Sequence, residues 1–209
     1  VGVIGAGISG LFIANLFKRN SNYQITVFEK NLTINLEKGY GIQLSVNSVK
    51  LLNQIGFDKF EADKKSNPDK INFYSIKSFN KICDLDISEF NSQDCKYTTL
   101  KRSDLVNFLK MDLEQSIKIN HNISRIDQEN KKIKLNFENN ETFECDYLII
   151  SDGVFSKCKS LISNNQTQPM FNKTLAIRGM ILNSHKIDCK NISLFLGPDF
   201  HQVIYPVNP

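Results

Sequence analysis

The alternation of hydrophobic and polar positions at the start of the chain predicts a strand, a turn, a helix and a second strand. An apolar run at 1–4 leads into glycines and then into a stretch whose apolar positions recur at helical spacing. That stretch carries Leu11, Ala14, Leu16 and Phe17. A second apolar run ends in Val27 and Phe28, and Glu29 and Lys30 follow it. The first 30 residues therefore predict one βαβ unit.

The remaining pattern predicts two more helices and a series of strands. One helix is expected over about 47–55, ended by Gly56 in a left-handed conformation, and another begins at Arg102. A polar loop at 61–70 is predicted as a boundary. Strands are predicted at 71–77, 79–87, 97–100, 117–120, 133–137, 143–145, 147–151, 174–181, 192–196 and 203–205. The run at 147–151 lacks alternation, which predicts a strand covered on both faces.

The three glycines of the first turn have separate physical tasks. Gly5 makes a tight turn after the first strand, Gly7 lets a diphosphate approach the bare backbone, and Gly10 lets the helix pack closely. The free N–H groups at the start of the helix stabilise negative charge. Glu29 stands 19 residues after Gly10 (29 − 10), near the offset of about 20 residues at which an acid binds a ribose hydroxyl. The unit predicts a site for an ADP moiety without a 2′-phosphate.

The same segment could also be a glycine-rich core turn or a secretory signal. A signal peptide has a basic segment before its apolar run and a small-residue cleavage site after it. Here the apolar run starts at the first residue and ends in Lys18 and Arg19. We therefore discard the secretory signal.

Composition narrows the function classes. The net charge is only +4, from 26 basic and 22 acidic residues that alternate along the chain, which argues against nucleic-acid binding. No apolar stretch approaches the roughly 20 residues of a membrane helix. The cysteines show no metal-ligand spacing and are expected to be reduced, unpaired thiols of a cytoplasmic protein. They are Cys83, Cys95, Cys145, Cys158 and Cys189.

Four separated segments resemble the class A FAD-dependent aromatic monooxygenases. They are the glycine turn with Glu29-Lys30, the Gly39-Tyr40-Gly41-Ile42-Gln43-Leu44 segment, Leu100 to Leu105, and Tyr147 to Ser156 with its Asp152-Gly153 pair. Their order and spacing are similar to those of the salicylate, 3-hydroxybenzoate and 6-hydroxynicotinate hydroxylase branch. The resemblance extends over essentially the whole chain.

The resemblance implies an α/β fold of the p-hydroxybenzoate hydroxylase kind. A Rossmann-like FAD-binding domain of the GR2 type would take 1–70 and 97–165, and an inserted mixed or antiparallel β-sheet substrate domain would take 71–96 and 166–209. It implies FAD as cofactor and NADH or NADPH as co-substrate, with a small aromatic substrate hydroxylated by O₂ through a flavin hydroperoxide. It also leaves a homodimer open.

The same resemblance assigns cofactor contacts. Glu29 is similar to the acid on the adenosine ribose, Arg102 to the arginine along the ribityl and diphosphate, and Asp152 to the acid near the diphosphate. Surface or ordinary turn positions remain alternatives for Arg102 and Asp152. Ser151 and Lys159 depart from the usual Ala and Arg. The implied set is Gly5, Ala6, Gly7, Ser9, Gly10, Glu29, Lys30, Gly41 and Gln43 near the isoalloxazine, Arg102, Ile123 at the adenine, Asp152 and Gly153.

On the substrate side, the resemblance implies that His201 and Tyr205 face the ring being hydroxylated. Residues four apart on a strand share a face, and a neutral histidine can take a phenol proton. An exposed loop histidine with a core tyrosine is the alternative. Arg178 could meet a substrate carboxylate but is expected to pair within the second sheet, and His121 and His185 are expected at the surface.

Family members carry a further Gly-Asp motif beyond the position of Pro209, so the chain is expected to be incomplete at its C-terminus, by cropping or by truncation. Three alternatives stay open on the same scaffold. They are a hydroxylase of ubiquinone biosynthesis, a flavin reductase or sensor that performs no oxygenation, and a truncated fold that binds a nucleotide and catalyses nothing.

Overall fold

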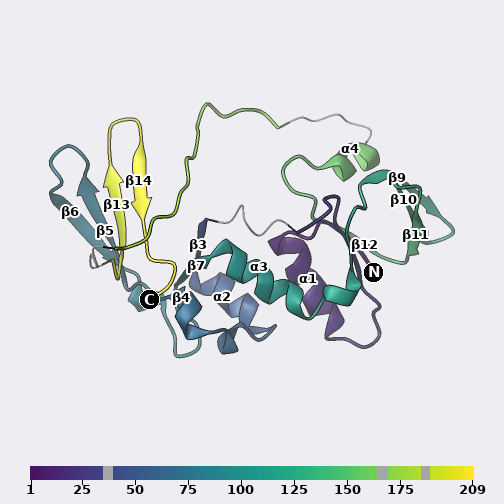
Figure 1. Ribbon diagram of the computed structural model, residues 1–209, viewed down its shortest axis with the longest axis horizontal. Coiled ribbons are helices and arrows are strands. Elements are labelled where there is room, and N and C mark those ends of the chain that lie inside the picture. The colour runs from purple at the N-terminus through teal and green to yellow at the C-terminus, as the bar shows by residue number, and fades with distance from the viewer. Residues whose placement is uncertain (35–39, 164–168, 185–188) are drawn as a thin grey trace. The chain divides into compact units, whose positions relative to one another are not determined.

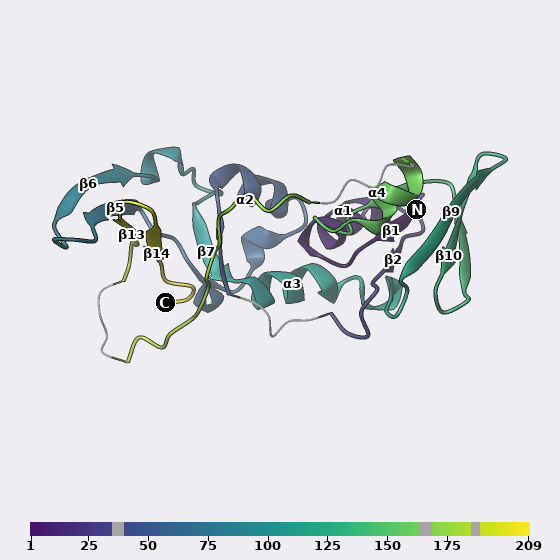
Figure 2. The ribbon, with the colours of Figure 1, turned by 90° about the horizontal axis from the view of Figure 1, so that it is seen from above.

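A computed structural model describes residues 1–34, 40–163, 169–184 and 189–209 (Figures 1 and 2). The chain forms two compact units, each built from two stretches of sequence. Unit 1 comprises Val1–Leu36 and Val106–Ala176, and unit 2 comprises Glu37–Leu105 and Ile177–Pro209. The two units are defined by contacts between residues. The predicted division into a cofactor domain and a substrate domain is defined by function, and it stays a prediction.

A four-stranded parallel sheet forms the first layer of unit 1. Its strands are β1 (Gly2–Ile4), β2 (Thr26–Phe28), β8 (Ile117–Lys118) and β12 (Leu148–Ile150), in the order β12-β1-β2-β8. Helix α1 (Ile8–Lys18) makes the crossover between β1 and β2 and buries Leu11 and Ala14. The predicted βαβ unit is therefore confirmed.

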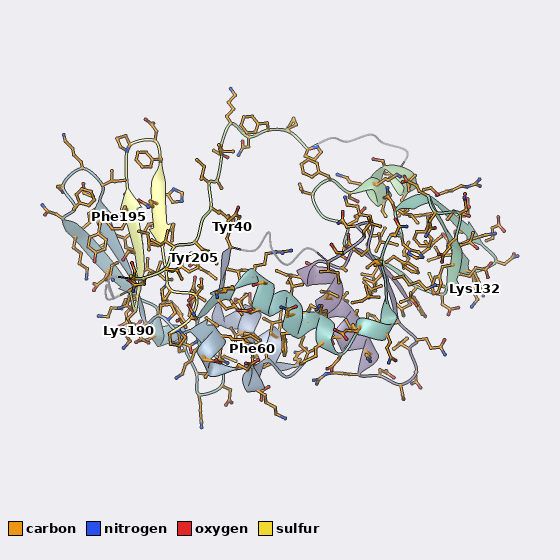
Figure 3. All side chains as sticks on the ribbon, in the orientation of Figure 1. Tyr40, Phe60, Lys132, Lys190, Phe195 and Tyr205 are labelled. Atoms are coloured by element: carbon orange, nitrogen blue, oxygen red, sulfur yellow. The ribbon has the colours of Figure 1, made fainter. Side chains whose placement is uncertain are left out.

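A three-stranded antiparallel sheet is the second layer of unit 1. Its strands are β9 (Ile123–Glu129), β10 (Lys132–Phe137) and β11 (Thr142–Cys145), which lie side by side in Figure 1. The β9–β10 turn has positive φ at both Asn130 and Lys131, as a two-residue hairpin requires. The buried side of β10 carries Leu135 and Phe137, and Lys132 on the other side is exposed (Figure 3). This is the predicted hairpin with one wet face.

The aromatic core of unit 1 joins these two layers. The Phe28 ring lies 4.7 Å from the Phe137 ring and 5.0 Å from the Phe143 ring, centroid to centroid. Helix α4 (Lys157–Ser163) adds the buried Cys158 to the same core. A short 3₁₀ helix, η4 (Glu114–Ser116), precedes β8.

Unit 2 contains a small antiparallel sheet and a helix that packs near it. The strands are β3 (Gly41–Leu44), β4 (Lys65–Ser66) and β7 (Thr98–Lys101), in the order β3-β7-β4. Helix α2 (Val46–Asn53) follows β3 directly. Helix α3 (Arg102–Met111) follows β7, and its residues from Val106 on belong to unit 1. Gly56 is left-handed, with φ of 94°, as predicted. Short 3₁₀ helices are η1 (Phe57–Lys59), η2 (Ala62–Lys64) and η3 (Ser88–Phe90).

A four-stranded mixed sheet completes unit 2. Its strands are β5 (Lys70–Ser75), β6 (Lys81–Asp86), β13 (Ile192–Leu196) and β14 (His201–Ile204), in the order β14-β13-β5-β6. In Figure 1 the yellow β13 and β14 therefore stand beside the blue β5 and β6. Phe195, labelled in Figure 3, stacks on Tyr74 of the neighbouring strand at 5.0 Å.

Four predictions about elements need correction. The strand β9 was not predicted, and β4 lies inside the predicted loop 61–70. The strand predicted at 174–181 is absent, because this described segment pairs with none of the described strands and exposes its apolar side chains. Strand β12 is an edge strand, so Tyr147 next to it is 63 % exposed instead of covered on both faces.

Candidate functional site

The glycines in the turn after β1 are of two kinds, those that have no room for a side chain and one that does. A Cβ atom at Gly10 would lie 2.0 Å from the Gly5 carbonyl oxygen, and one at Gly5 would lie 2.5 Å from the Ser151 carbonyl oxygen. Gly5 also has φ of 98°, which disfavours any side chain. A Cβ atom at Gly7 would meet nothing within 4 Å. Gly5 and Gly10 are thus required by the fold, whereas Gly7 leaves space above the turn.

The N-terminus of α1 is open toward that space. Gly7 occupies its N-cap, no side chain caps the helix, and its first turn contains no acidic residue. Its first N–H groups and the positive end of its dipole can therefore receive an anion. Bare Gly7 and the uncapped helix together fit a diphosphate.

Glu29 follows β2 and lies against the same turn. Its Oε2 accepts a hydrogen bond from the Ala6 N–H at 3.0 Å. Its Oε1 accepts from the backbone N–H of Asn31 at 3.0 Å and from Asn31 Nδ2 at 2.6 Å. The carboxylate is fixed beside the turn, and an ionised carboxylate has further acceptor capacity for a hydroxyl group.

The Asp152-Gly153 pair also meets the glycine turn. A Cβ atom at Gly5 would lie 3.2 Å from the Asp152 Cα. Asp152 Oδ2 accepts a hydrogen bond from the Cys158 N–H at 3.0 Å, at the start of α4. Burial raises the pKa of Asp152, but hydrogen bonds with Ser156 and with the Cys158 backbone lower it, and the net direction is downward. Gly153 has φ of 84° and open space around it.

Ser151 connects β12 to the turn. Its hydroxyl donates to the Ile4 carbonyl oxygen at 2.8 Å, and the Gly5 carbonyl oxygen is 3.3 Å away. The sequence marked Ser151 only as a departure from the usual alanine. The hydrogen bond depends on the parallel pairing of β12 with β1. These strands are far apart in the sequence, so the local pattern around Ser151 does not predict this contact.

The other predicted cofactor residues of unit 1 occupy three different environments. Ala6 is buried in the turn, and Ser9 in the first turn of α1 and Lys30 after β2 are exposed. Ile123 begins β9, where it pairs with Phe137 and is buried. The adenine contact predicted for its backbone stays a prediction.

His121 is buried, which corrects its expected surface position. It is 7 % exposed, its Nδ1 lies 2.6 Å from the Ile119 carbonyl oxygen, and its Nε2 lies 3.1 Å from Glu141 Oε2. Its ring packs on Phe28 and Phe137. These contacts make it a structural residue of the core. His185 lies outside the described residues.

Unit 2 brings Gly41, Gln43 and Tyr205 together. A Cβ atom at Gly41 would lie 2.7 Å from Tyr205 Cε2 and 2.8 Å from its hydroxyl oxygen, so the ring of Tyr205 covers this glycine. Gln43, on the same face of β3, accepts a hydrogen bond from the Tyr97 hydroxyl at 2.8 Å. Sequence reasoning missed Tyr97. Its position depends on the antiparallel pairing of β3 with β7.

His201 lies on strand β14, and Tyr205 follows the end of that strand. His201 begins β14, where it pairs with Leu196 and is exposed. Strand β14 ends at Ile204, so the shared strand face on which the prediction relied does not include Tyr205. Tyr205 is instead held by its neighbour, because the Pro206 carbonyl oxygen accepts a hydrogen bond from Thr99 Oγ1 at 2.6 Å.

Two arginines of unit 2 carry candidate positive charge. Arg102 begins α3, and its backbone N–H donates to the Tyr40 carbonyl oxygen at 2.9 Å. Arg178 is exposed in a segment without strand structure and interacts electrostatically with Tyr205, so it does not pair within a sheet as expected. Neither guanidinium forms an ion pair with a carboxylate in the described ranges.

The described residues contain no group of three or more His, Cys, Asp or Glu side chains that could hold a metal ion. None of their helices has both the length and the apolar character needed to cross a membrane. The five cysteines are free, as predicted.

A family model described as "FAD binding domain" matches residues 1–194. The chain belongs to this FAD-binding family. Since that family binds FAD, the predicted cofactor is confirmed. Gly7 and the uncapped start of α1 fit a diphosphate, and their role as its binding site stays a prediction.

Curated relatives of this FAD-binding chain include a hydroxylase and a monooxygenase. It is 24 % identical over 228 aligned positions to salicylate hydroxylase from Pseudomonas putida, which covers 99 % of the chain and 51 % of the relative. It is 25 % identical over 213 positions to 3-amino-4-hydroxybenzoate 2-monooxygenase from Streptomyces cremeus, which covers 99 % and 53 %. The chain spans about half the length of the curated relatives it matches.

Solved structures confirm the α/β fold. Klebsiella pneumoniae HpxO, complexed with FAD and uric acid, matches 98 % of the chain and 52 % of its own length, with a TM-score of 0.78 and 17 % identity. The 2,6-dihydroxypyridine-3-hydroxylase from Arthrobacter nicotinovorans matches 98 % and 51 %, with a TM-score of 0.77 and 16 % identity. At these identities the likeness concerns the fold.

Proposed function

We propose that the whole protein is an FAD-dependent monooxygenase that hydroxylates a small aromatic substrate with NADH or NADPH and O₂. The observation that carries the proposal is the family match over residues 1–194, together with an open, uncapped helix start beside Glu29. Relatives named as hydroxylases of salicylate and of an aminohydroxybenzoate support the aromatic substrate class.

In this proposal, unit 1 holds the ADP half of FAD. The N–H groups at the start of α1 bind the diphosphate over Gly7, and the Glu29 carboxylate accepts a hydrogen bond from a ribose hydroxyl. Asp152 and Gly153 border the same turn, and the backbone of Ile123 serves the adenine. Ser9 and Lys30 contribute polar contacts at the edge of the site.

Residues of unit 2 are proposed for the other half of the cofactor and for the substrate. Arg102 supplies positive charge to the diphosphate, and a cation at a helix start gains from an anionic partner because the dipole there disfavours it. Gln43 and the backbone of Gly41 serve the isoalloxazine, which would have to lie beside the Tyr205 ring because that ring covers the Cα of Gly41. When bound, FAD supplies the redox and oxygen-activating chemistry.

His201 is proposed as the general base. A neutral imidazole nitrogen takes the proton of the substrate hydroxyl, which makes the ring carbon beside it more nucleophilic. The Tyr205 hydroxyl orients the substrate by hydrogen bonding. The exposure of His201 means that bound substrate has to exclude water from its imidazole for this role.

The test uses the longest form of the protein that its gene encodes. Its flavin spectrum is recorded, and oxidation of NADH and NADPH is measured against a panel of aromatic acids and phenols, with product analysis. We expect bound FAD and substrate-stimulated hydroxylation of one class of ring. Failure to bind or reconstitute flavin would overturn the proposal. Flavin-dependent oxidation of NADH or NADPH without a hydroxylated product identifies a reductase instead, and turnover only of prenylated phenols identifies a quinone-pathway hydroxylase.

The His201→Ala variant tests the base within the same assay. We expect its turnover to fall by roughly 100-fold or more, because general-base catalysis contributes about 10² to 10⁴. His121→Ala is not a suitable control, since that ring is part of the core. Unchanged turnover of His201→Ala across the pH range would remove the assignment.

A further inference from the structure

The side chain of Tyr97 is half-buried and lies next to Gln43 of β3. Its hydroxyl donates to Gln43 Oε1 at 2.8 Å. Its backbone N–H donates to Asn91 Oδ1 at 2.8 Å, and its carbonyl oxygen accepts from Asn67 Nδ2 at 3.0 Å. The backbone of Tyr97 is thus held on both sides, and the hydrogen bond to Gln43 holds its phenol.

The amide of Gln43 stands between two tyrosines. A glutamine side chain has one acceptor oxygen and one donor NH₂ group. The Tyr97 hydroxyl occupies the oxygen, which leaves the NH₂ group for the second tyrosine. Tyr205 is the partner within reach, because its hydroxyl oxygen would lie 2.8 Å from a Cβ atom at Gly41, on the same face of β3 as Gln43. Burial raises the pKa of Tyr205, and the Arg178 charge and a hydrogen bond with the Gln43 side chain oppose that rise.

Tyr205 cannot easily leave this position. Its ring covers the bare Cα of Gly41, and the neighbouring Pro206 is held by Thr99. Figure 3 labels Tyr205 where the chain leaves the yellow β14. A hydroxyl oxygen that accepts from Gln43 keeps its own proton for a third group.

We propose that Tyr97 is a positioning residue, which fixes the Gln43 amide so that the Tyr205 hydroxyl accepts from Gln43 and donates to an oxygen or nitrogen acceptor of a bound ligand. The assignment of that ligand as the aromatic substrate rests on the proposed function. The orientation of the three side chains does not, since it is a property of unit 2.

The effect on Tyr205 can be read directly from its ionisation. Charged and titratable groups that act on Tyr205 are Arg178 and Tyr97. Loss of the Tyr97 hydroxyl frees the amide of Gln43 to turn. The Gln43 NH₂ group then donates to Tyr205 for only part of the time. Because that hydrogen bond stabilises the tyrosinate, the pKa of Tyr205 rises.

The experiment places 3,5-difluorotyrosine, whose phenol ionises nearer neutral pH, at position 205 and follows its ¹⁹F resonance against pH. No flavin or substrate is present. We expect Tyr97→Phe and Gln43→Leu each to shift the titration midpoint to higher pH. In the double variant the shift should equal that of Gln43→Leu alone, since both act through one amide. Tyr74→Phe, a tyrosine stacked in the other sheet of unit 2, is the matched control and should leave the midpoint unchanged.

An unchanged midpoint in Tyr97→Phe overturns the proposal, as does a shift that adds fully to that of Gln43→Leu. Thermal unfolding shows whether each variant is folded. If Gln43→Leu has the same pH titration midpoint as the wild type, that result by itself also overturns the proposal. A protein that binds no FAD contradicts the proposed function but leaves this titration valid. Bound FAD with an unmoved midpoint contradicts only the role of Tyr97.

Discussion

The Glu29 carboxylate and the Ala6 backbone N–H are joined by a hydrogen bond of 3.0 Å. This bond connects the end of β2 to the turn after β1, the two points between which a dinucleotide's ribose and diphosphate bind in this type of unit. The acid is therefore already oriented by the protein. A preoriented carboxylate lowers the entropic cost of binding a ribose hydroxyl.

Replacement of this acid should weaken cofactor binding. In Glu29→Gln a charged acceptor becomes neutral, and hydrogen bonds to charged groups contribute about 1.5–3 kcal/mol. We expect the Kd for FAD to rise by roughly 10-fold or more, measured by quenching of flavin fluorescence. Glu144→Gln, the same change on an exposed strand position of unit 1, should leave the Kd unchanged. Equal Kd values for the two variants would contradict the role of Glu29.

Gly10→Ala should damage the fold. Alanine is favoured over glycine in a helix by about 1 kcal/mol, but its Cβ would lie 2.0 Å from the Gly5 carbonyl oxygen. Overpacking of this kind costs about 3 kcal/mol or more and outweighs the gain. Urea unfolding should show a lower midpoint with a similar slope. A midpoint at or above that of the wild type would show that the turn can open without cost.

Asp152 should contribute to stability in a pH-dependent way. The net downward direction of its pKa means that the folded state favours the carboxylate. The stabilisation is present above the ordinary value of 3.8 and is lost as the pH falls through the lower folded pKa. Asp152→Asn should therefore show a shallower loss of unfolding free energy between pH 5 and pH 3 (approximate limits) than the wild type. Asp112→Asn, an exposed position of unit 1, serves as control.

The cysteines should differ sharply in reactivity. Burial, with the nearby charge of Asp152, raises the pKa of Cys158 to about 12, and its side chain is fully buried. Cys83 is exposed. Because the thiolate is the reactive form, iodoacetamide at about pH 8 should label Cys83 in the folded protein and leave Cys158 unlabelled until urea is added. Peptide mass spectrometry measures both. Early labelling of Cys158 would mean that α4 opens in the native state.

The parts of the site that are local in sequence could be predicted from it. Gly5, Gly7, Gly10 and Glu29 lie within one βαβ unit, where element length fixes their spacing. The apolar run at 147–151 also predicted Asp152-Gly153 at the end of a strand. The structure pairs that strand with β1 and brings the two residues to the glycine turn.

Features that depend on long-range pairing could not be predicted in the same way. The hydrogen bond of Tyr97 to Gln43 requires the register of β3 against β7. The contact of Tyr205 with Gly41 joins residues from distant parts of the chain, and Tyr205 lies just after the end of β14 instead of on the strand that the pattern predicts. His121 was misplaced because its burial depends on Phe137, a residue of another strand.

The most direct test of the central claim compares FAD binding by the wild-type protein and by Gly7→Ala. A Cβ atom at Gly7 meets nothing in the protein, and its φ of −80° suits alanine, so the fold should keep its unfolding free energy within about 0.5 kcal/mol. The same methyl group occupies the space proposed for the diphosphate. We predict saturable FAD binding by the wild type and a loss of at least about 10-fold in affinity for Gly7→Ala. Equal affinities in two folded proteins, or no saturable binding by the wild type, would contradict the account.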